Sequence, residues 1–173
     1  MKIFKRIFPI LTIASLLILP SCFSDDESYD YIAWRNLNLI YLDSVSKATE
    51  DGKLLYTPIT PVWDKSITVY LKWHNDRDES EKGITPLSTS TCYVKYTLTN
   101  IVGDTLDSSN SFKCTPNGTV TGFMTALTNM HVNDSVTAVV PYTAGYGVYG
   151  SGSILPFTTL IFDIKLDSIS QLM

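Results

Sequence analysis

The sequence has few of the residues that carry metal and acid–base chemistry, with two histidines and three cysteines among 173 residues. His74 and His131 stand in polar, loop-like segments, and we expect both side chains to be solvated. The histidines and cysteines lack the spacing of a zinc site, and no serine belongs to a motif with a histidine. We therefore expect no metal and no cofactor, and the sequence argues against nucleophilic hydrolysis.

A nucleotide-binding loop and a long hydrophobic run are also missing. The densest glycine run, residues 145–152, precedes Pro156 and a strand-like stretch rather than a helix, which argues against a phosphate-binding loop. The apolar run Phe8–Leu19 is too short to span a membrane. The sequence therefore offers no phosphate-binding loop ahead of a helix, and the apolar run is not a membrane span.

Basic residues are scarce after the first few positions. Lys2, Lys5 and Arg6 precede the apolar run, which is the organisation of a signal peptide, and we assign residues 1–21 to it. Without that segment the chain has 10 Lys plus Arg against 17 Asp plus Glu, a formal charge of −7. This charge argues against nucleic acid as a partner and against electrostatic docking on anionic lipid.

The end of this leader, Leu19-Pro20-Ser21-Cys22, resembles the lipobox of bacterial lipoproteins. The resemblance implies that Cys22 becomes the first residue, carries acyl chains and anchors the protein in the cell envelope, facing the periplasm or the cell surface. A signal peptide with a free cysteine is the alternative. The acidic residues that follow resemble a surface-export signal, and a solvated linker explains them equally well.

Residues 22–65 are predicted to be a tether and helical extension. The stretch 31–48 carries apolar residues at positions 34, 37, 41 and 45, has Asp30 as a candidate N-cap and is followed by Asp51-Gly52, which predicts an amphipathic helix. The stretch up to residue 65 is expected to be irregular. We expect the extension to pack against the next domain or to hold it above the membrane; a dimerisation helix is less favoured.

Residues 66–173 are predicted to form one domain. Apolar residues alternate along several short segments, which is typical of strands with one face on a core. A single segment has helical spacing, with Val120, Phe123, Met124 and Leu127 on one face. The predicted elements are strands over 66–73, 91–100 and 105–109, a helix over 119–130, a strand ending at Pro141, and a strand over 160–166.

The long segment between the last two strands is dense in glycine and tyrosine. Loops of this length in a compact domain are usually functional. Tyr142, Tyr146 and Tyr149 are large and apolar for a solvated linker, and we expect the glycines at 145, 147, 150 and 152 to allow positive φ angles. The pattern predicts a binding loop between two central strands, and packed tyrosines in an ordinary hairpin are the alternative.

Several motifs occur together in one order along the chain. They are Val94-x-Tyr96-Thr97, Leu106-Asp107-Ser108-Ser109, Thr119-Val120-x-Gly122-Phe123, Pro141-x-x-x-x-Tyr146-Gly147, Gly150-x-Gly152, Leu155-Pro156 and Thr159-Leu160-x-Phe162-x-Ile164-x-Leu166. Over about residues 66–168 the chain thereby resembles FKBP-type peptidyl-prolyl isomerases. The resemblance implies an α+β fold, in which an FKBP-like curved antiparallel β-sheet wraps around one short α-helix.

The resemblance also implies a binding site. Its walls would be Tyr96, Leu106, Phe112, Val120, Phe123, Leu155 and Phe162. The Tyr146 hydroxyl and the Val120 backbone N–H would donate hydrogen bonds to substrate carbonyl groups, and Asp107 would orient Tyr96. Tyr146, Asp107 and Tyr96 are accordingly the predicted catalytic residues. Each aromatic residue taken alone is equally compatible with ordinary core packing.

The implied reaction is cis–trans isomerisation of X-Pro bonds in exported polypeptides, which needs no acid, base or metal. The barrier to amide rotation is about 18–20 kcal/mol. A catalyst can lower it by holding the twisted amide in an apolar pocket with fixed donors. The implied partners are proline-containing polypeptides.

Three residues depart from the family pattern. Leu106 replaces a phenylalanine, Leu98 replaces a glycine and Phe157 replaces a proline. Each change can reshape the pocket without unfolding the domain. A second function therefore stays open, a non-catalytic peptide-binding or chaperone module, or a structural surface lipoprotein on the same scaffold.

The resemblance finally places Cys92 and Cys114 on neighbouring strands. Paired cysteines commonly form bridges in oxidising compartments. A disulfide between them is one expectation, and two buried free thiols are the other.

Overall fold

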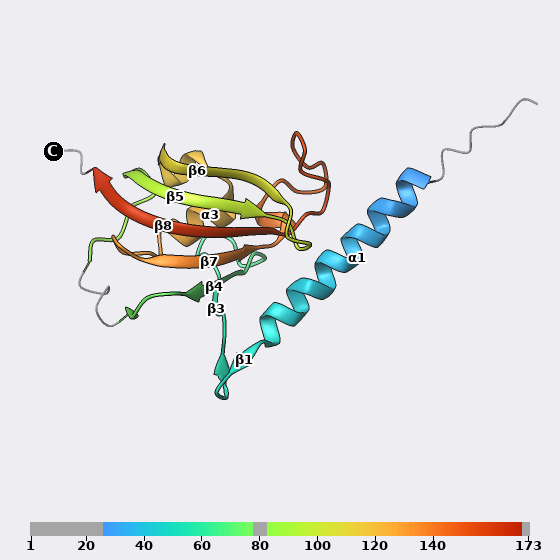
Figure 1. Cartoon of the computed structure of the whole chain (residues 1–173), viewed down its shortest axis with the longest axis horizontal. Helices are drawn as coiled ribbons and strands as arrows, with labels where there is room; N and C mark the ends of the chain where they lie inside the picture. Colours follow the sequence, from blue (N-terminus) through green and yellow to red (C-terminus); the bar gives the residue numbers. More distant parts are fainter. Residues whose placement is uncertain (1–25, 78–82, 171–173) are drawn as a thin grey trace, which may run out of the picture.

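The computed structural model describes residues 26–77 and 83–170. The predicted signal peptide and Cys22 lie outside these ranges. A long N-terminal helix lies beside one end of a curved antiparallel sheet, and a short helix covers one face of that sheet (Figure 1). The predicted fold class, an antiparallel sheet with one short helix and an N-terminal helical extension, is confirmed.

The elements follow one another along the chain, and a long connection, residues 141–159, joins β7 to β8. In order they are α1 (Asp26–Lys47), β1 (Thr49–Glu50), β2 (Lys53–Leu54), β3 (Thr57–Ile59), β4 (Val69–Trp73), β5 (Thr91–Thr99), β6 (Thr105–Cys114), the 3₁₀ turn η1 (Pro116–Gly118), α3 (Thr121–Leu127), β7 (Ser135–Val140), the 3₁₀ turn η2 (Tyr142–Ala144) and β8 (Leu160–Ser170). The main sheet has the order β3-β4-β7-β8-β5-β6, with antiparallel pairs throughout, and β1 and β2 form a separate hairpin.

The core lies between the sheet and α3. Strand β8 illustrates the pattern, because Leu160, Phe162, Ile164 and Leu166 alternate along it and all are buried in this core. Burial of one such side chain contributes about 1.5–3 kcal/mol. The period-2 pattern therefore identifies which residues of a strand face the core. Strands β7 and β8 are adjacent near the middle of the sheet, as expected.

Helix α3 packs closely on β7 through Gly122. A Cβ atom at this position would lie 2.1 Å from Cγ1 of Val140, so any side chain would push the helix off the sheet. Phe123, Ala126 and Leu127 are buried on the same side of the helix. The helix is shorter than predicted, because it is preceded by the turn η1 and ends at Leu127 rather than at residue 130.

The N-terminal extension differs from the prediction in several ways. Helix α1 starts at Asp26, so Asp30 lies within it and is not an N-cap. Leu37, expected on the buried face, is 52% exposed, whereas Asn38 is fully buried. The stretch expected to be irregular contains β3, which pairs with β4 at the edge of the main sheet. Within the described residues, no helix is long and apolar enough to cross a membrane.

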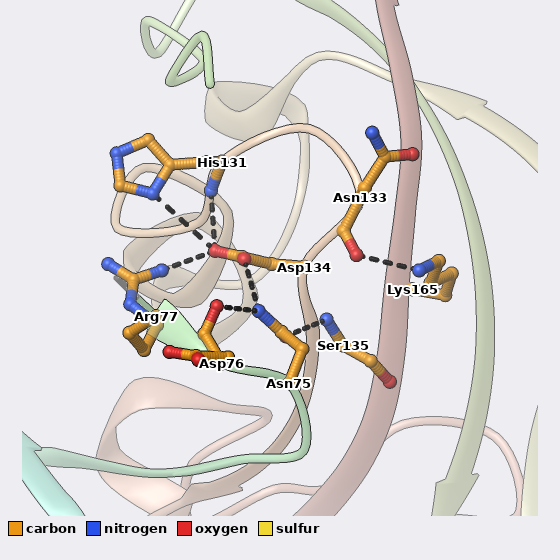
Figure 2. Close-up of polar contacts among 8 residues, drawn as sticks. All are labelled: Asn75, Asp76, Arg77, His131, Asn133, Asp134, Ser135 and Lys165. Atoms are coloured by element: carbon orange, nitrogen blue, oxygen red, sulfur yellow. Dashed lines mark hydrogen bonds and ion pairs between the residues drawn. The ribbon is translucent and has the colours of Figure 1, made fainter. Parts of the chain in front are cut away.

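At the end of the sheet where β7 begins, a buried carboxylate joins the turn before β7 to the segment after β4 (Figure 2). Asp134 is completely buried and accepts hydrogen bonds from Arg77 Nη1, from Asn75 Nδ2 at 2.9 Å and from the backbone N–H of His131 at 2.7 Å. Asn75 in turn accepts a hydrogen bond from the backbone N–H of Ser135 at 2.8 Å. The cluster therefore fixes the turn before β7 to the segment that follows β4.

The same cluster changes the expected environment of one histidine. His131 was predicted to be solvated, but its side chain is only 16% exposed and its Nδ1 atom lies 3.6 Å from Asp134 Oδ2. His74 is exposed, and its Nε2 is 2.7 Å from Thr137 Oγ1. The prediction failed for His131 because the Asp134 cluster is assembled from residues far apart in the sequence.

This cluster yields a stability prediction. Asp134→Ala removes the buried carboxylate that accepts from Arg77 Nη1, Asn75 Nδ2 and the His131 backbone N–H, and we expect a loss of about 3–5 kcal/mol in the free energy of unfolding. The matched control is Asp167→Ala, because Asp167 pairs with Lys95 at 3.4 Å in an exposed position and should cost less than about 1 kcal/mol. Urea titrations of both variants measure the difference, and equal midpoints would contradict a structural role for the cluster.

Candidate active site

A cavity of about 470 Å³ opens between the sheet and the start of α3. It is lined by Tyr96 and Leu98 of β5, Asp107 and Phe112 of β6, residues 118–120 ahead of α3, Phe123 of α3, Tyr146 of the β7–β8 loop and Phe162 of β8. Three strands, the helix and the long loop therefore all contribute to one site.

The inner wall of the cavity is a cluster of aromatic rings around Tyr96. Its ring centroid lies 5.4 Å from that of Phe112, 5.8 Å from that of Phe123 and 6.3 Å from that of Phe162. The rings of Phe123 and Phe162 are 5.0 Å apart. Three of these four pairs meet edge to face, the arrangement that the quadrupoles of aromatic rings favour. The cluster forms a rigid apolar surface that can receive a flat, non-polar ring.

One polar pair borders this surface. The Tyr96 hydroxyl donates a hydrogen bond to Asp107 Oδ2 at 2.5 Å, and Asp107 Oδ1 accepts one from the backbone N–H of Ser108 at 2.8 Å. Burial raises the pKa of the Tyr96 phenol, and the hydrogen bond to Asp107 raises it further. The phenol therefore stays protonated at neutral pH, and its hydroxyl donates its hydrogen bond to the Asp107 carboxylate. A bulge in the β5–β6 pairing lies between Val94 and Tyr96, beside this pair.

Two hydrogen-bond donors at the cavity remain available. The Tyr146 hydroxyl has no hydrogen-bond partner among residues 26–77 and 83–170, and its side chain is 37% exposed. The Val120 backbone N–H likewise has no acceptor in the described part of the chain. Val120 is the N-cap of α3, so its carbonyl accepts the first backbone bond of the helix, from the Met124 N–H, while its own N–H stays unused. Both groups can donate to a molecule that enters the cavity.

Most of the predicted site residues come together here, but two do not. Tyr96, Asp107, Phe112, Val120, Phe123, Tyr146 and Phe162 line the cavity. Leu155 does not line it and is 48% exposed. Leu106 is not in the lining either and packs against the core instead. Tyr149, whose size and apolar ring argued against a solvated linker, is 90% exposed.

The sequence analysis missed Leu98, Gly118 and Thr119 as lining residues. A signal existed for Leu98, because it follows Tyr96 by two residues and the period of a strand places both on one face. Thr119 begins one of the quoted motifs but was not assigned to the site. No signal in the sequence identified Gly118, since it belongs to the turn η1 and the path of this turn depends on the tertiary fold.

The β7–β8 loop that carries Tyr146 folds back on itself. Gly147, Gly150 and Gly152 have positive φ angles as expected, whereas Gly145 has φ −110. At Gly150 a Cβ atom would meet the carbonyl oxygen of Ile154 at 2.1 Å, so the turn closes too tightly for any side chain. The loop is thus a defined structure, and it places Tyr146 at the cavity.

The family model of FKBP-type peptidyl-prolyl cis-trans isomerases matches residues 82–167. This part of the chain belongs to that family. The FKBP domain thus includes β5, β6, α3, β7 and most of β8, and every lining residue of the cavity. The FKBP-type 22 kDa peptidyl-prolyl cis-trans isomerase of Escherichia coli is 36% identical to this chain over 90 residues. The match covers 49% of this chain and 44% of the relative.

Solved structures agree on the fold. A peptidyl-prolyl cis-trans isomerase from Pseudomonas syringae pv. tomato superposes with a TM-score of 0.65 at 22% identity, over 81% of this chain and 96% of that one. FkpA from Escherichia coli gives a TM-score of 0.68 at 22% identity, over 84% of this chain and 63% of that one. At this level of identity, the similarity shows that the FKBP-like fold is shared.

The two cysteines of the FKBP domain face each other across β5 and β6. Cys92 and Cys114 are direct partners in the antiparallel register, and both thiols are free in this structure. Burial raises the pKa of each thiol to about 11, so almost no thiolate forms at neutral pH. Direct partners in an antiparallel pair have Cα atoms about 4.5–5.5 Å apart, a separation that a disulfide can bridge.

Because Cys92 and Cys114 are direct partners in the register, a disulfide between them is sterically possible and can be tested. We expect chain recovered from an oxidising compartment to be lighter by two hydrogen atoms than the reduced chain. After denaturation without reductant, an alkylating reagent should add no group to Cys92 or Cys114. The measurement is intact mass with and without reductant, with Cys114→Ser as the control that cannot form this bridge. Alkylation of both cysteines without reductant would contradict the disulfide.

Proposed function

We propose that this chain is a peptidyl-prolyl cis-trans isomerase that acts on proline-containing polypeptides exported to the cell envelope. Membership of the FKBP family supports the reaction type. The observation that carries the proposal is the cavity itself, an aromatic surface next to two unused hydrogen-bond donors. This combination fits the demands of amide rotation and supplies no group for hydrolysis.

The reaction needs a pocket that prefers the twisted amide to the planar one. Rotation removes the resonance between nitrogen and carbonyl, which lowers the charge separation of the amide. An apolar surface formed by Phe112, Phe123 and Phe162 favours this less polar species and accepts the proline ring. The Tyr146 hydroxyl and the Val120 N–H would hold carbonyl oxygens of the substrate while the bond turns.

Tyr96 and Asp107 have a supporting role in this proposal. The Tyr96 hydroxyl already donates to Asp107, so it is not free to bind a substrate carbonyl in the same way as Tyr146. The pair fixes the Tyr96 ring at the centre of the aromatic cluster. Asp107 acts through Tyr96 and is not required as a base.

The second candidate is a binding module that holds proline segments without catalysis. Leu98 favours it, because this side chain lines the cavity at a position where the family pattern has glycine. A leucine here fills space that a substrate ring could otherwise use. Binding without acceleration of isomerisation would identify this function.

We further propose that Cys22 is lipidated and that the protein is anchored in the cell envelope. The leader sequence before Cys22 supports this proposal. Anchoring would keep the domain near polypeptides that are exported to the cell envelope. Attachment through several acyl chains would be stable without basic residues on the domain.

The donor role of Tyr146 is tested by Tyr146→Phe, which keeps the ring and removes the hydroxyl. One neutral hydrogen bond is worth roughly 1–1.5 kcal/mol, so we expect kcat/KM for a short X-Pro peptide to fall about tenfold with the melting temperature unchanged. Tyr149→Phe is the matched control, because Tyr149 belongs to the same loop and is 90% exposed. Phe162→Ala should reduce both rate and stability, the latter by about 3–5 kcal/mol.

The outcomes separate the two functions. Equal rates for the wild type and Tyr146→Phe would show that the donor is assigned wrongly. A wild type that binds proline peptides and does not accelerate their isomerisation would overturn the enzymatic proposal in favour of the binding module.

The anchor is tested separately by Cys22→Ala. We expect this variant to appear in the soluble fraction of the cell envelope, because position 22 no longer has a thiol to acylate, while the wild type stays with the membranes. Cys114→Ser serves as the control, since it removes a cysteine within the FKBP domain. Membrane fractionation of Cys22→Ala like that of the wild type would reject lipid attachment at this residue.

A further inference from the structure

Helix α1 is bound to the end of the β7–β8 loop by two side-chain hydrogen bonds. The backbone N–H of Thr159 donates to Asn38 Oδ1 at 2.6 Å, and Trp34 Nε1 donates to Thr158 Oγ1 at 3.0 Å. Asn38 is completely buried, and its Nδ2 donates to the Trp34 carbonyl at 2.8 Å, so its amide is satisfied on both sides. A buried asparagine with this geometry fixes the two segments in one register.

A third contact joins the same helix to the neighbouring residue. Phe157 has φ 62, a left-handed conformation that costs of order 1 kcal/mol or more for a non-glycine residue and persists only where its surroundings enforce it. The Arg35 guanidinium lies 5.3 Å from the centre of the Phe157 ring. The ring of Tyr142 lies 5.4 Å away and meets it edge to face. Helix α1 is thus part of what holds this strained residue.

The strained residue is directly connected to the predicted donor of the cavity. The Phe157 backbone N–H donates to the Gly147 carbonyl at 3.0 Å, and the Gly147 N–H donates to the Tyr142 carbonyl at 2.9 Å. Gly147 immediately follows Tyr146, so these two bonds fix the peptide next to the tyrosine. The path from α1 to the cavity therefore consists of Asn38, the segment 157–159, Gly147 and Tyr146.

The Trp34 contact reaches the loop by a second path. The Thr158 hydroxyl, which accepts from Trp34, itself donates to the Leu155 carbonyl at 2.7 Å. This two-bond chain closes the turn that brings the loop back into β8. Residues 154–159 are consequently held from outside by α1 and from inside by their own hydrogen bonds.

We propose that Asn38 and Trp34 are positioning residues, which act through the β7–β8 loop to place the Tyr146 hydroxyl at the cavity. The proposal rests on the proposed isomerase function for its kinetic part, while its structural part stands on the contacts alone. Neither residue lies in the part of the chain that matches the FKBP family model, which begins at residue 82. Helix α1 is thus a component of the site and more than a connection to the N-terminus.

Removal of the Asn38 side chain should loosen the β7–β8 loop and leave the sheet unchanged. In Asn38→Ala the Thr159 N–H loses its acceptor in a buried position. The loop then no longer has all the contacts that enforce the left-handed Phe157, and the bond from Phe157 to Gly147 should open more often. The alternating core of β8 and its pairing with β5 do not include Asn38.

Hydrogen exchange of the full-length chain measures this directly. We compare Asn38→Ala with Asn36→Ala, because Asn36 lies on the same helix and is exposed. In Asn38→Ala the amides of Thr159 and Phe157 should exchange at least about tenfold faster than in Asn36→Ala, while Val94 in β5 keeps its protection. Trp34→Phe, which removes only the indole donor, should give a smaller increase in the same segment.

Kinetics test whether this loosening reaches the cavity. We expect Asn38→Ala to lower kcat/KM for an X-Pro peptide several-fold relative to Asn36→Ala. The same substitution in a Tyr146→Phe background should have much less effect, because the hydroxyl that Asn38 helps to place is already missing. A purely structural role for Asn38 would instead give the same factor in both backgrounds.

Each result decides one part of the proposal. Equal exchange of Thr159 and Phe157 in Asn38→Ala and Asn36→Ala would overturn it, whatever the activity. Faster exchange combined with an unchanged rate, or with the same loss in the Tyr146→Phe background, would overturn the link to Tyr146. Should the wild type prove inactive, the isomerase function fails, and the exchange measurement still decides whether α1 holds the loop.

Discussion

The contact of Phe123 with Tyr96 and Phe162 is the interaction on which the rest of this structure depends. It joins α3 to two neighbouring strands of the sheet, β5 and β8. The helix can approach this closely because Gly122 presents no side chain to Val140. The same rings that close the core are the inner wall of the cavity. Core packing and the binding surface therefore cannot be altered independently.

Much of the FKBP domain could be predicted from its sequence, because its strands alternate over a buried face and its motifs occur in one order. The alternation at positions 160, 162, 164 and 166 places β8 without any tertiary information. Most of the cavity lining followed from the same motifs. Leu155 does not line the cavity, since the path of the β7–β8 loop depends on turns and long-range contacts that local patterns do not determine.

The polar features were the ones that the sequence did not predict. The Asp134 cluster draws on the segments around residues 75, 131 and 135, and nothing in any one of them indicates a buried carboxylate. The burial of Asn38 was missed because a helix-period analysis counts only apolar positions, so Leu37 was placed inward instead. Buried polar residues are positioned by partners far along the chain, and a single sequence does not show which partners meet.

The docking of α1 also has a mechanical consequence. A helix rises about 1.5 Å per residue, so the rod from residue 26 to Asn38 is about 18 Å long and contains no hinge. Figure 1 shows this part of α1 extending past the sheet. A force applied at the outer end of this helix would act as a torque about the contact between Asn38 and Thr159. The orientation of the cavity would therefore follow the orientation of helix α1, which a flexible connection would not allow.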